Sequence, residues 1–248
     1  MADTYYSGQG RVLVAKRGLN GDPLSMRFIG NVPEFKISPK SDVLEHKEST
    51  TGQRAVDKRI AKGKSLDVSA TLEDFQAKNL ELVMYGESTL TPAVIAETTD
   101  IPASPAVGSV FSLGFMNVSN VVITNFLSAT VVPAINYTVD PVFGTVKVNI
   151  AFAGTGIYVA TFDAGAATTI NIFSQPIPEV YMRVEGLNTA DDNKPVLIEL
   201  YRVATDPAKE LGFINDDFGK YELSGSVLAD STKPAGGYLG QFGRVVLA

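Results

Sequence analysis

The sequence predicts a mainly β protein: a β-sandwich or barrel-like core with one flanking α-helix, a long hairpin arm and an inserted small β subdomain. Short stretches that alternate apolar and polar residues recur along the chain, which is typical of half-buried strands. Lys40–Lys64 is dense in charge, whereas Glu87–Phe173 has one basic and five acidic residues. We therefore expect a split core, residues 1–86 and 174–248, interrupted by an inserted subdomain at 87–173.

The first strands follow from alternation and turn residues. Arg11–Ala15 leads into the turn-rich Gly18–Pro23, and its Asn-Gly pair favours a tight reversal. Met26–Ile29 then returns as a second strand. In Phe35–Ser38 the apolar residues point one way and the polar residues the other, so one face is core and one is wet.

The arm, Lys40–Lys64, contains seven Lys or Arg and four Asp or Glu residues. Its flanks, Val43–His46 and Arg54–Ala61, are expected to pair as a long hairpin around a tip of turn residues. Because an isolated two-stranded hairpin is marginally stable in water, we expect another protein chain to cover it.

A helix is predicted at Leu72–Tyr85, directly after the alternating strand Leu66–Ala70. Thr71 is placed to cap it, and Gly86 is placed to end it. Its apolar residues fall near one face, so we expect it to pack on the sheet.

The remaining strands divide between the inserted subdomain and the second half of the core. A turn at Asp140–Gly144 separates two strands of the insertion. The expected strands of the insertion are Val121–Thr124, Tyr137–Val139, Thr145–Ile150 and Ile157–Phe162. Those of the core are Val180–Glu185, Val196–Val203 and Tyr221–Ala229. Val180, Met182 and Val184 are expected on one face, with Tyr181, Arg183 and Glu185 on the other.

Composition limits the possible functions. A hydrophobic content of 45% with 19% charged residues lies in the globular range, and the net charge of −6 argues against affinity for nucleic acid through phosphate neutralisation. The absence of cysteine excludes disulfides and thiolate chemistry. Met1–Gly10 has no secretory signal pattern, and prolines and glycines interrupt the uncharged Ile101–Val139 before a membrane-spanning length is reached.

Candidate catalytic or metal-binding residues are few. His46 suits a general base or pH switch by type, but it has no second histidine or cysteine for a metal site, and a polar arm residue is the simpler interpretation. Asp191-Asp192 and Asp216-Asp217 offer paired carboxylates for hydrolysis or calcium, yet both pairs stand among turn residues without the spacing of a calcium loop. We expect no catalytic, cofactor or metal site.

Several segments resemble the major tail tube proteins of bacteriophages, which are related in fold to the tube proteins of type VI secretion. The resemblance covers roughly residues 8 to 86 and 176 to 232 and depends mainly on the order of the segments. The segments are Gly30–Phe35, Leu44–Ser49 with Gly52–Arg54, Leu66–Phe75, Met84–Gly86, Pro178–Asn188 and Glu222–Asp230.

The resemblance implies a non-enzymatic virion protein, made in the host cytoplasm, that assembles into stacked hexameric rings. Phage DNA would pass through the lumen without specific binding. The implied partners are further copies of the chain and the tape measure, tail terminator and tail tip or baseplate proteins, with no membrane. Lys40–Lys64 would be the arm that reaches neighbouring subunits, and 87–173 would decorate the tube exterior. The implied inter-subunit residues are Lys40, Glu45, His46, Lys47, Glu48, Gln53, Arg54, Asp57, Lys58 and Arg59.

Two other functions remain open from the sequence. A β-sandwich adhesin or carbohydrate-binding module would use the insertion for recognition, although the chain has no tryptophan to stack on sugars and relies on nine tyrosines. A hydrolase built on the aspartate pairs would require one of them to act as a catalytic dyad.

Overall fold

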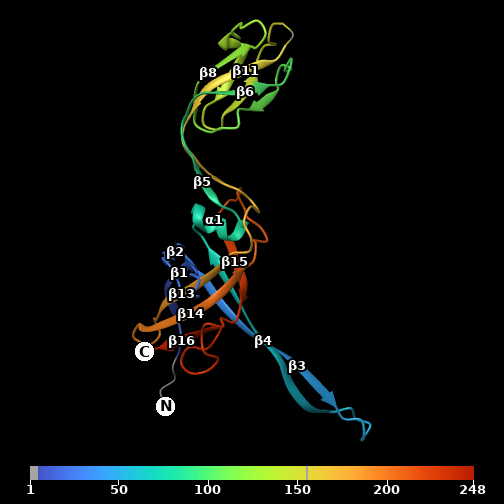
Figure 1. Cartoon of the computed structure of the whole chain (residues 1–248), viewed down its shortest axis with the longest axis vertical. Helices are drawn as coiled ribbons and strands as arrows, with labels where there is room; N and C mark the ends of the chain where they lie inside the picture. Colours follow the sequence, from blue (N-terminus) through green and yellow to red (C-terminus); the bar gives the residue numbers. More distant parts are fainter. Residues whose placement is uncertain (1–4, 155) are drawn as a thin grey trace. The chain divides into compact units, whose positions relative to one another are not determined.

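The computed structural model describes residues 5–154 and 156–248, which form two compact units (Figure 1). The split unit comprises the chain up to Ser88 together with Ile170–Ala248, and the inserted unit comprises Thr89–Thr169. The sequence places these boundaries at 87 and 173. Composition marks where surface charge changes, whereas the boundary in the structure lies within a two-stranded sheet of β5 (Ser88–Thr91) and β12 (Ala167–Ile170).

The split unit contains one eight-stranded sheet in which every pairing is antiparallel. Its strand order is β2-β1-β13-β14-β15-β4-β3, and β16 pairs with β14 beside β15. The strands are β1 (Gly8–Lys16), β2 (Arg27–Phe28), β3 (Glu34–Lys47), β4 (Val56–Leu72), β13 (Glu179–Asn188), β14 (Lys194–Thr205), β15 (Tyr221–Val227) and β16 (Gly243–Leu247). One edge of β14 thus pairs with two strands, with β16 along Val196–Leu200 and with β15 along Val203–Thr205.

The sheet folds over so that its two ends cover one core. Val12 and Val14 of β1 lie in the same buried cluster as Val68 and Ala70 of β4, although three strands separate β1 from β4 in the sheet. Val83 of the helix α1 (Ala77–Met84) joins the same cluster. Each fully buried side chain of this size stabilises the fold by about 1.5–3 kcal/mol. The result is the mainly β, sandwich-like core with one helix that the alternation predicts.

The second face of β13 is less exposed to solvent than the alternation predicts. Val180 and Met182 are buried in the main core as expected. Tyr181, expected on the polar face, is only 4% exposed, because its ring stacks on Tyr201 at 6.4 Å and Leu239 packs against the pair. The segment after β15 therefore covers part of a sheet face that the sequence assigns to solvent.

The predicted start of the helix is wrong. β4 continues through Leu72, which pairs with Tyr221 of β15, so neither Thr71 nor Leu72 is available to begin a helix. The helix begins at Ala77, after Gln76, an extended residue that makes no side-chain cap hydrogen bond. Cross-strand pairing with β15 overrides the local capping signal, because such a signal is only a weak preference.

The helix ends near the expected place but by a different residue. Tyr85 takes the left-handed conformation with φ 49°, and Gly86 donates its N–H to the carbonyl of Glu81. Gly86 is required for another reason: a Cβ at this position would lie 2.0 Å from the carbonyl oxygen of Asn171. The glycine thus permits a close approach of two backbone segments.

The inserted unit consists of two three-stranded antiparallel sheets around a core of its own. One sheet has the order β6-β11-β8 and the other β7-β10-β9. The elements are β6 (Val94–Ile101), β7 (Val110–Ser112), β8 (Val118–Asn125), the 3-10 helix η1 (Ala134–Asn136), β9 (Tyr137–Asp140), β10 (Thr145–Val148) and β11 (Tyr158–Ala164). Ile123, Val146 and Tyr158 are almost fully buried at its centre.

The predicted turn at Asp140–Gly144 is confirmed. The Asp140 carboxylate accepts the N–H groups of Val142 and Phe143, at 3.0 and 3.2 Å, and Gly144 has φ 60°. Among the helices that the structure describes, none has the length and apolar character needed to span a membrane.

Candidate assembly surface

The arm is a two-stranded continuation of β3 and β4 beyond the rest of the sheet (Figure 1). The four short strands expected around it merge into two long ones, because the pairing of Glu34 with Thr71 continues to the pairing of Lys47 with Val56. The register shifts twice, between Asp42 and Val43 and between His46 and Lys47. Such bulges increase the local twist of a hairpin.

The arm makes almost no packing contacts within its own chain. From Ser38 to Ser65 no residue is buried, and only Val43 and Glu48 are partly covered. Leu44 and Ile60, directly opposite each other across the two strands, are 52% and 50% exposed. A cross-strand apolar pair of this kind contributes at most about 1 kcal/mol by itself. The hairpin therefore lacks the burial that normally supports two strands.

Polar contacts along the arm are exposed and correspondingly weak. Lys40 Nζ lies 2.5 Å from Asp67, His46 Nδ1 lies 2.6 Å from Asp57, and Arg59 Nε lies 3.6 Å from Glu45. The hydrogen bond between Lys40 and Asp67 raises the pKa of the lysine and lowers the pKa of the aspartate. Exposed ion pairs contribute about 0–1 kcal/mol each, so these contacts orient side chains without holding the arm rigid.

The tip of the arm is organised by Glu48. Its carboxylate accepts the backbone N–H groups of Thr50 and Thr51, at 2.8 and 2.9 Å, and the hydroxyl groups of both threonines. Hydrogen bonds from Thr51, followed by those from Thr50, lower the pKa of Glu48 to about 2. Gly52 and Arg54 then take positive φ angles of 77° and 49°, which complete the reversal. The tip thus has a defined conformation, although it is exposed.

The arm differs in charge from the rest of the chain. Its seven basic and four acidic residues give a formal charge of +3, so the remainder, with 14 basic and 23 acidic residues, carries −9. Among the described residues, these basic arm residues form no ion pair: Lys47, Arg54, Lys58, Lys62 and Lys64. The arm is thus a basic, partly apolar ribbon attached to an acidic body.

The sequence-predicted site residues all lie on this ribbon. The structure brings Glu45 together with Arg59 and His46 together with Asp57, while Lys58 stands directly opposite His46. The Gln53 N–H is 3.5 Å from the Thr51 hydroxyl, at the limit of hydrogen-bonding distance. The sequence did not indicate that Glu48 organises the tip. The run Glu48-Ser49-Thr50-Thr51-Gly52, an acceptor followed by turn residues, is the signal from which this role could be inferred.

The other candidate residues do not assemble into a catalytic or metal site. Among the described residues, no group of three or more His, Asp or Glu side chains is placed to hold a metal ion. Asp191 contacts Lys194 at 2.9 Å, and Asp192 and Asn193 have positive φ angles, so the first aspartate pair belongs to a turn as expected. The Asp217 carboxylate accepts the N–H of Phe218 at 2.7 Å.

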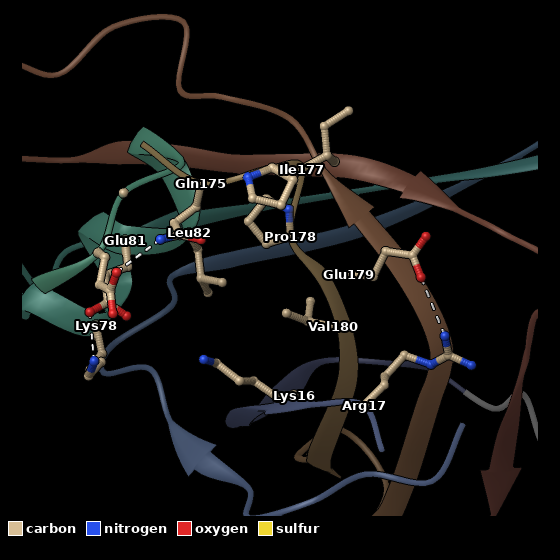
Figure 2. A pocket seen from close by; sticks show the side chains of 13 residues that line it. Lys16, Arg17, Lys78, Glu81, Leu82, Gln175, Ile177, Pro178, Glu179 and Val180 are labelled. Atoms are coloured by element: carbon tan, nitrogen blue, oxygen red, sulfur yellow. Dashed lines mark hydrogen bonds and ion pairs between the residues drawn. The ribbon is translucent and has the colours of Figure 1, made fainter. Parts of the chain in front are cut away.

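A hollow of about 380 Å³ lies between the end of β1, helix α1 and the segment before β13 (Figure 2). Figure 2 shows Lys16 across the hollow from Pro178, with Lys78 and Glu81 paired at one side. Burial would raise the pKa of Glu81, but hydrogen bonds from Lys78 and Ser88 outweigh burial and lower it. Glu179 is paired with Arg17 and Arg202. The charges that line the hollow are thus only partly paired, because Lys16 and Glu87 form no ion pair among the described residues.

A second polar cluster joins three strands of the sheet. Glu199 of β14, only 7% exposed, accepts hydrogen bonds from Tyr181 at 2.5 Å, Arg183 at 3.1 Å and Arg244 at 2.5 Å. Burial would raise the pKa of Glu199, but these hydrogen bonds and the two nearby guanidinium groups lower it. Burial and the bond to Glu199 raise the pKa of Tyr181. The Glu199 carboxylate thus links β14 to β13 and to β16.

Fold and surface together define a mainly β protein whose sheet extends into an exposed basic arm. A family model described as "Protein of unknown function UCP028589" matches residues 5–246, and the chain belongs to this family. A search of curated proteins found no match.

Proposed function

We propose that this protein is the structural subunit of a bacteriophage tail tube, and that its copies assemble as hexameric rings stacked into a conduit for genome delivery into the host. The observation that carries this proposal is the arm, in which no residue from Ser38 to Ser65 is buried. A hairpin without burial gains stability when another chain covers it. Assembly supplies that cover in the resembling tail tube proteins.

The edges of the sheet also favour assembly. In the split unit, the end strands β2 and β3 each have one partner strand. Unpaired strand edges are templates for association, and closed assemblies of identical subunits remove them. Joining copies side by side would satisfy these backbone groups and cover the arm at the same time.

The charge distribution suits a DNA conduit. The part of the chain outside the arm carries −9, and an acidic lining would repel phosphates, so DNA would pass through without specific binding. The proposed partners are further copies of the chain and the tape measure, tail terminator and tail tip or baseplate proteins. The proposed location is the virion tail, without a catalytic step, a cofactor or a membrane.

The test is assembly. We expect purified protein, supplied with its initiator complex, to form hollow tubes that are visible by negative-stain electron microscopy. We expect deletion of residues 50–54 to leave the fold intact but to block polymerisation. A control deletion of residues 103–104, also exposed but in the inserted unit, should still polymerise. Monomers alone under every condition would refute the tube proposal, and tubes of normal length from the 50–54 deletion would refute the role of the arm.

A second candidate function is a carbohydrate-binding module in the inserted unit. β11 pairs Tyr158 with Ile101 and Asn125, at the end of the sheet opposite the residues where the chain enters and leaves the unit. Phe126 and Leu127 follow at that end and are 67% and 76% exposed. An exposed aromatic ring such as that of Phe126 can stack on a sugar ring. Binding of soluble monomer to a glycan array, lost in Phe126→Ala, would favour this function over the tube.

A further inference from the structure

The loop between β14 and β15 exposes an unusual group of side chains. Ile214 is 99% exposed, Phe218 86% and Phe213 69%, and Asp216 and Asp217 lie between them in the chain. Single exposed apolar residues are ordinary, but three large ones within six positions form a patch of the kind found at protein interfaces. We call Phe213–Phe218 the acidic loop.

The base of the acidic loop is anchored by aromatic contacts, whereas Asp216 and Asp217 have no cationic partner among the described residues. The Phe213 ring lies 6.2 Å from the Phe75 ring, which in turn lies 5.0 Å from Tyr221. Asp216 and Asp217 make no ion pair among the described residues. The loop thus presents apolar groups and two uncompensated carboxylates from a fixed base.

The arm has the complementary character. Leu44 and Ile60 provide an apolar pair, and Lys58 lies on the same face as Ile60 because the two residues are separated by two positions in the strand. Lys58 and Lys62 have no carboxylate partner among the described residues. Apolar groups flanked by lysines match apolar groups flanked by aspartates, and such charge complementarity fixes orientation and register at an interface.

The two surfaces of one chain lie at opposite ends of the same strand pair. Thr71 and Leu72 pair with Glu222 and Tyr221, directly after the loop, and Thr71 also pairs with Glu34. Leu44 is ten positions further along β3, a separation of about 33 Å at about 3.3 Å per residue. The loop of one chain therefore cannot reach the Leu44–Ile60 pair of its own arm, and a contact between the two requires a second copy.

We propose that the acidic loop of one copy docks on the arm of a second copy, with Ile214 and Phe218 against Leu44 and Ile60 and the two aspartates facing Lys58 and Lys62. The proposal rests on the self-assembly proposed above and names the surface on which the arm acts. The two faces are different patches of the same chain, so the contact is heterologous. Contacts of this kind generate closed rings when the rotation closes, and helical filaments otherwise.

Crosslinking provides the direct test, because the chain has no cysteine of its own. Ile214→Cys and Ile60→Cys chains carrying tags of different mass are mixed under assembly conditions and treated with a short bis-maleimide. We expect the mixed dimer to form at least about tenfold more than with Leu19→Cys in place of Ile214→Cys; Leu19 is fully exposed in another turn. A yield no higher than this control would overturn the docking.

Charge reversal provides a second test. We expect Asp216→Lys with Asp217→Lys to raise the protein concentration at which assembly begins about tenfold, and Lys58→Asp with Lys62→Asp in the same chain to restore assembly. Failure of the combined variant to recover, with circular dichroism unchanged, would count against the pairing. If tubes form but the crosslink between positions 214 and 60 is not preferred, only the docking of the acidic loop on the arm is overturned. If that crosslink is preferred but no tubes form, only the proposed tail tube is overturned.

Discussion

At the scale of single residues, the carboxylate of Glu48 has the clearest local role, because it stabilises the turn at the arm tip. Glu48 accepts four hydrogen bonds from Thr50 and Thr51, and one side chain thereby fixes a turn that has no burial to support it. The geometry resembles the side-chain caps that organise helix starts and tight turns elsewhere in proteins. The conformation of the tip thus depends on the charge of one residue.

We predict that Glu48 titrates with a pKa of about 2, below the usual value of 4.5. Because the pKa is lowered in the folded chain, the contribution of this residue to the tip turn is fully present above pH 4.5 and is lost as pH falls through about 2. Carboxyl NMR shifts followed against pH measure the titration. In Glu48→Ala the amides of Thr50 and Thr51 should exchange faster at neutral pH, while those of Val68 should not change.

The buried Glu199 permits a sharper stability prediction. Glu199→Ala leaves Tyr181 without an acceptor and removes the carboxylate that Arg183 and Arg244 share. We expect a loss of about 2–4 kcal/mol in the free energy of unfolding, measured by urea denaturation.

The pH dependence of the Glu199 contribution has a defined sign. Its folded-state pKa is lowered, so this contribution is present above about pH 4.5 and falls as the pH decreases below that value. The stability difference between the native chain and Glu199→Ala should therefore shrink in acid. A difference that stays constant from pH 7 to pH 3 would contradict the assignment.

At the scale of elements, alternation was a reliable guide and local capping signals were not. The strand pattern located the pairing segments of the sheet and the arm, because periodicity of two reports which face is buried. The helix start was missed because Thr71 and Leu72 are held by β15, a partner about 150 residues away that no local pattern reveals. The sequence did not predict β16 either, because Val245 and Leu247 are exposed and the strand shows no alternation of buried and exposed residues.

The candidate assembly surface was likewise only partly predictable from the sequence. The composition of the arm, basic with scattered apolar residues, was sufficient to predict an exposed hairpin. Register determines which residues meet: Leu44 stands opposite Ile60 in the segment between the two register shifts, at Asp42–Val43 and His46–Lys47. The sequence predicts a turn at Asp216-Asp217 but not an apolar surface beside it, because Phe213 and Phe218 are of a residue type common in cores and only their exposure in the structure shows otherwise.

The close approach behind α1 gives a prediction for one element. Gly86→Ala would place a Cβ 2.0 Å from the carbonyl oxygen of Asn171, so one backbone segment must move. We expect a loss of about 1–3 kcal/mol in the free energy of unfolding, measured by thermal or urea denaturation. Gly63→Ala is the matched control, because its Cβ would meet no atom within 4 Å, and its stability should stay within about 0.5 kcal/mol of the native chain.

At the scale of the whole molecule, the chain carries two separate cores. The buried cluster around Ile123 and Val146 draws only on the inserted unit, and the cluster around Val12 and Leu72 draws only on the split unit. Units with their own cores are expected to fold on their own. The arm and the acidic loop both belong to the split unit.

We predict that a fragment of residues 89–169 unfolds cooperatively by itself, as measured by circular dichroism during thermal denaturation. In a second variant a short Gly-Ser linker replaces the inserted unit and joins Ser88 directly to Ile170. This variant should retain the stability of the split unit, since the pairing of β5 with β12 shows that these two positions are close together in the native chain. An unfolded linker variant would show that the two cores depend on each other.

The pairing of β5 with β12 also bears on how the chain reaches its native state. β4 must meet β15, and β1 must meet β13, across the entire inserted unit, and such long-range encounters are slow because the entropy of loop closure opposes them. Once the inserted unit has formed, its paired ends bring Ser88 and Ile170 together, and the residues of Thr89–Thr169 no longer lengthen the loops that these pairings must close. Early formation of the insertion thus accelerates the search by the strands that flank it.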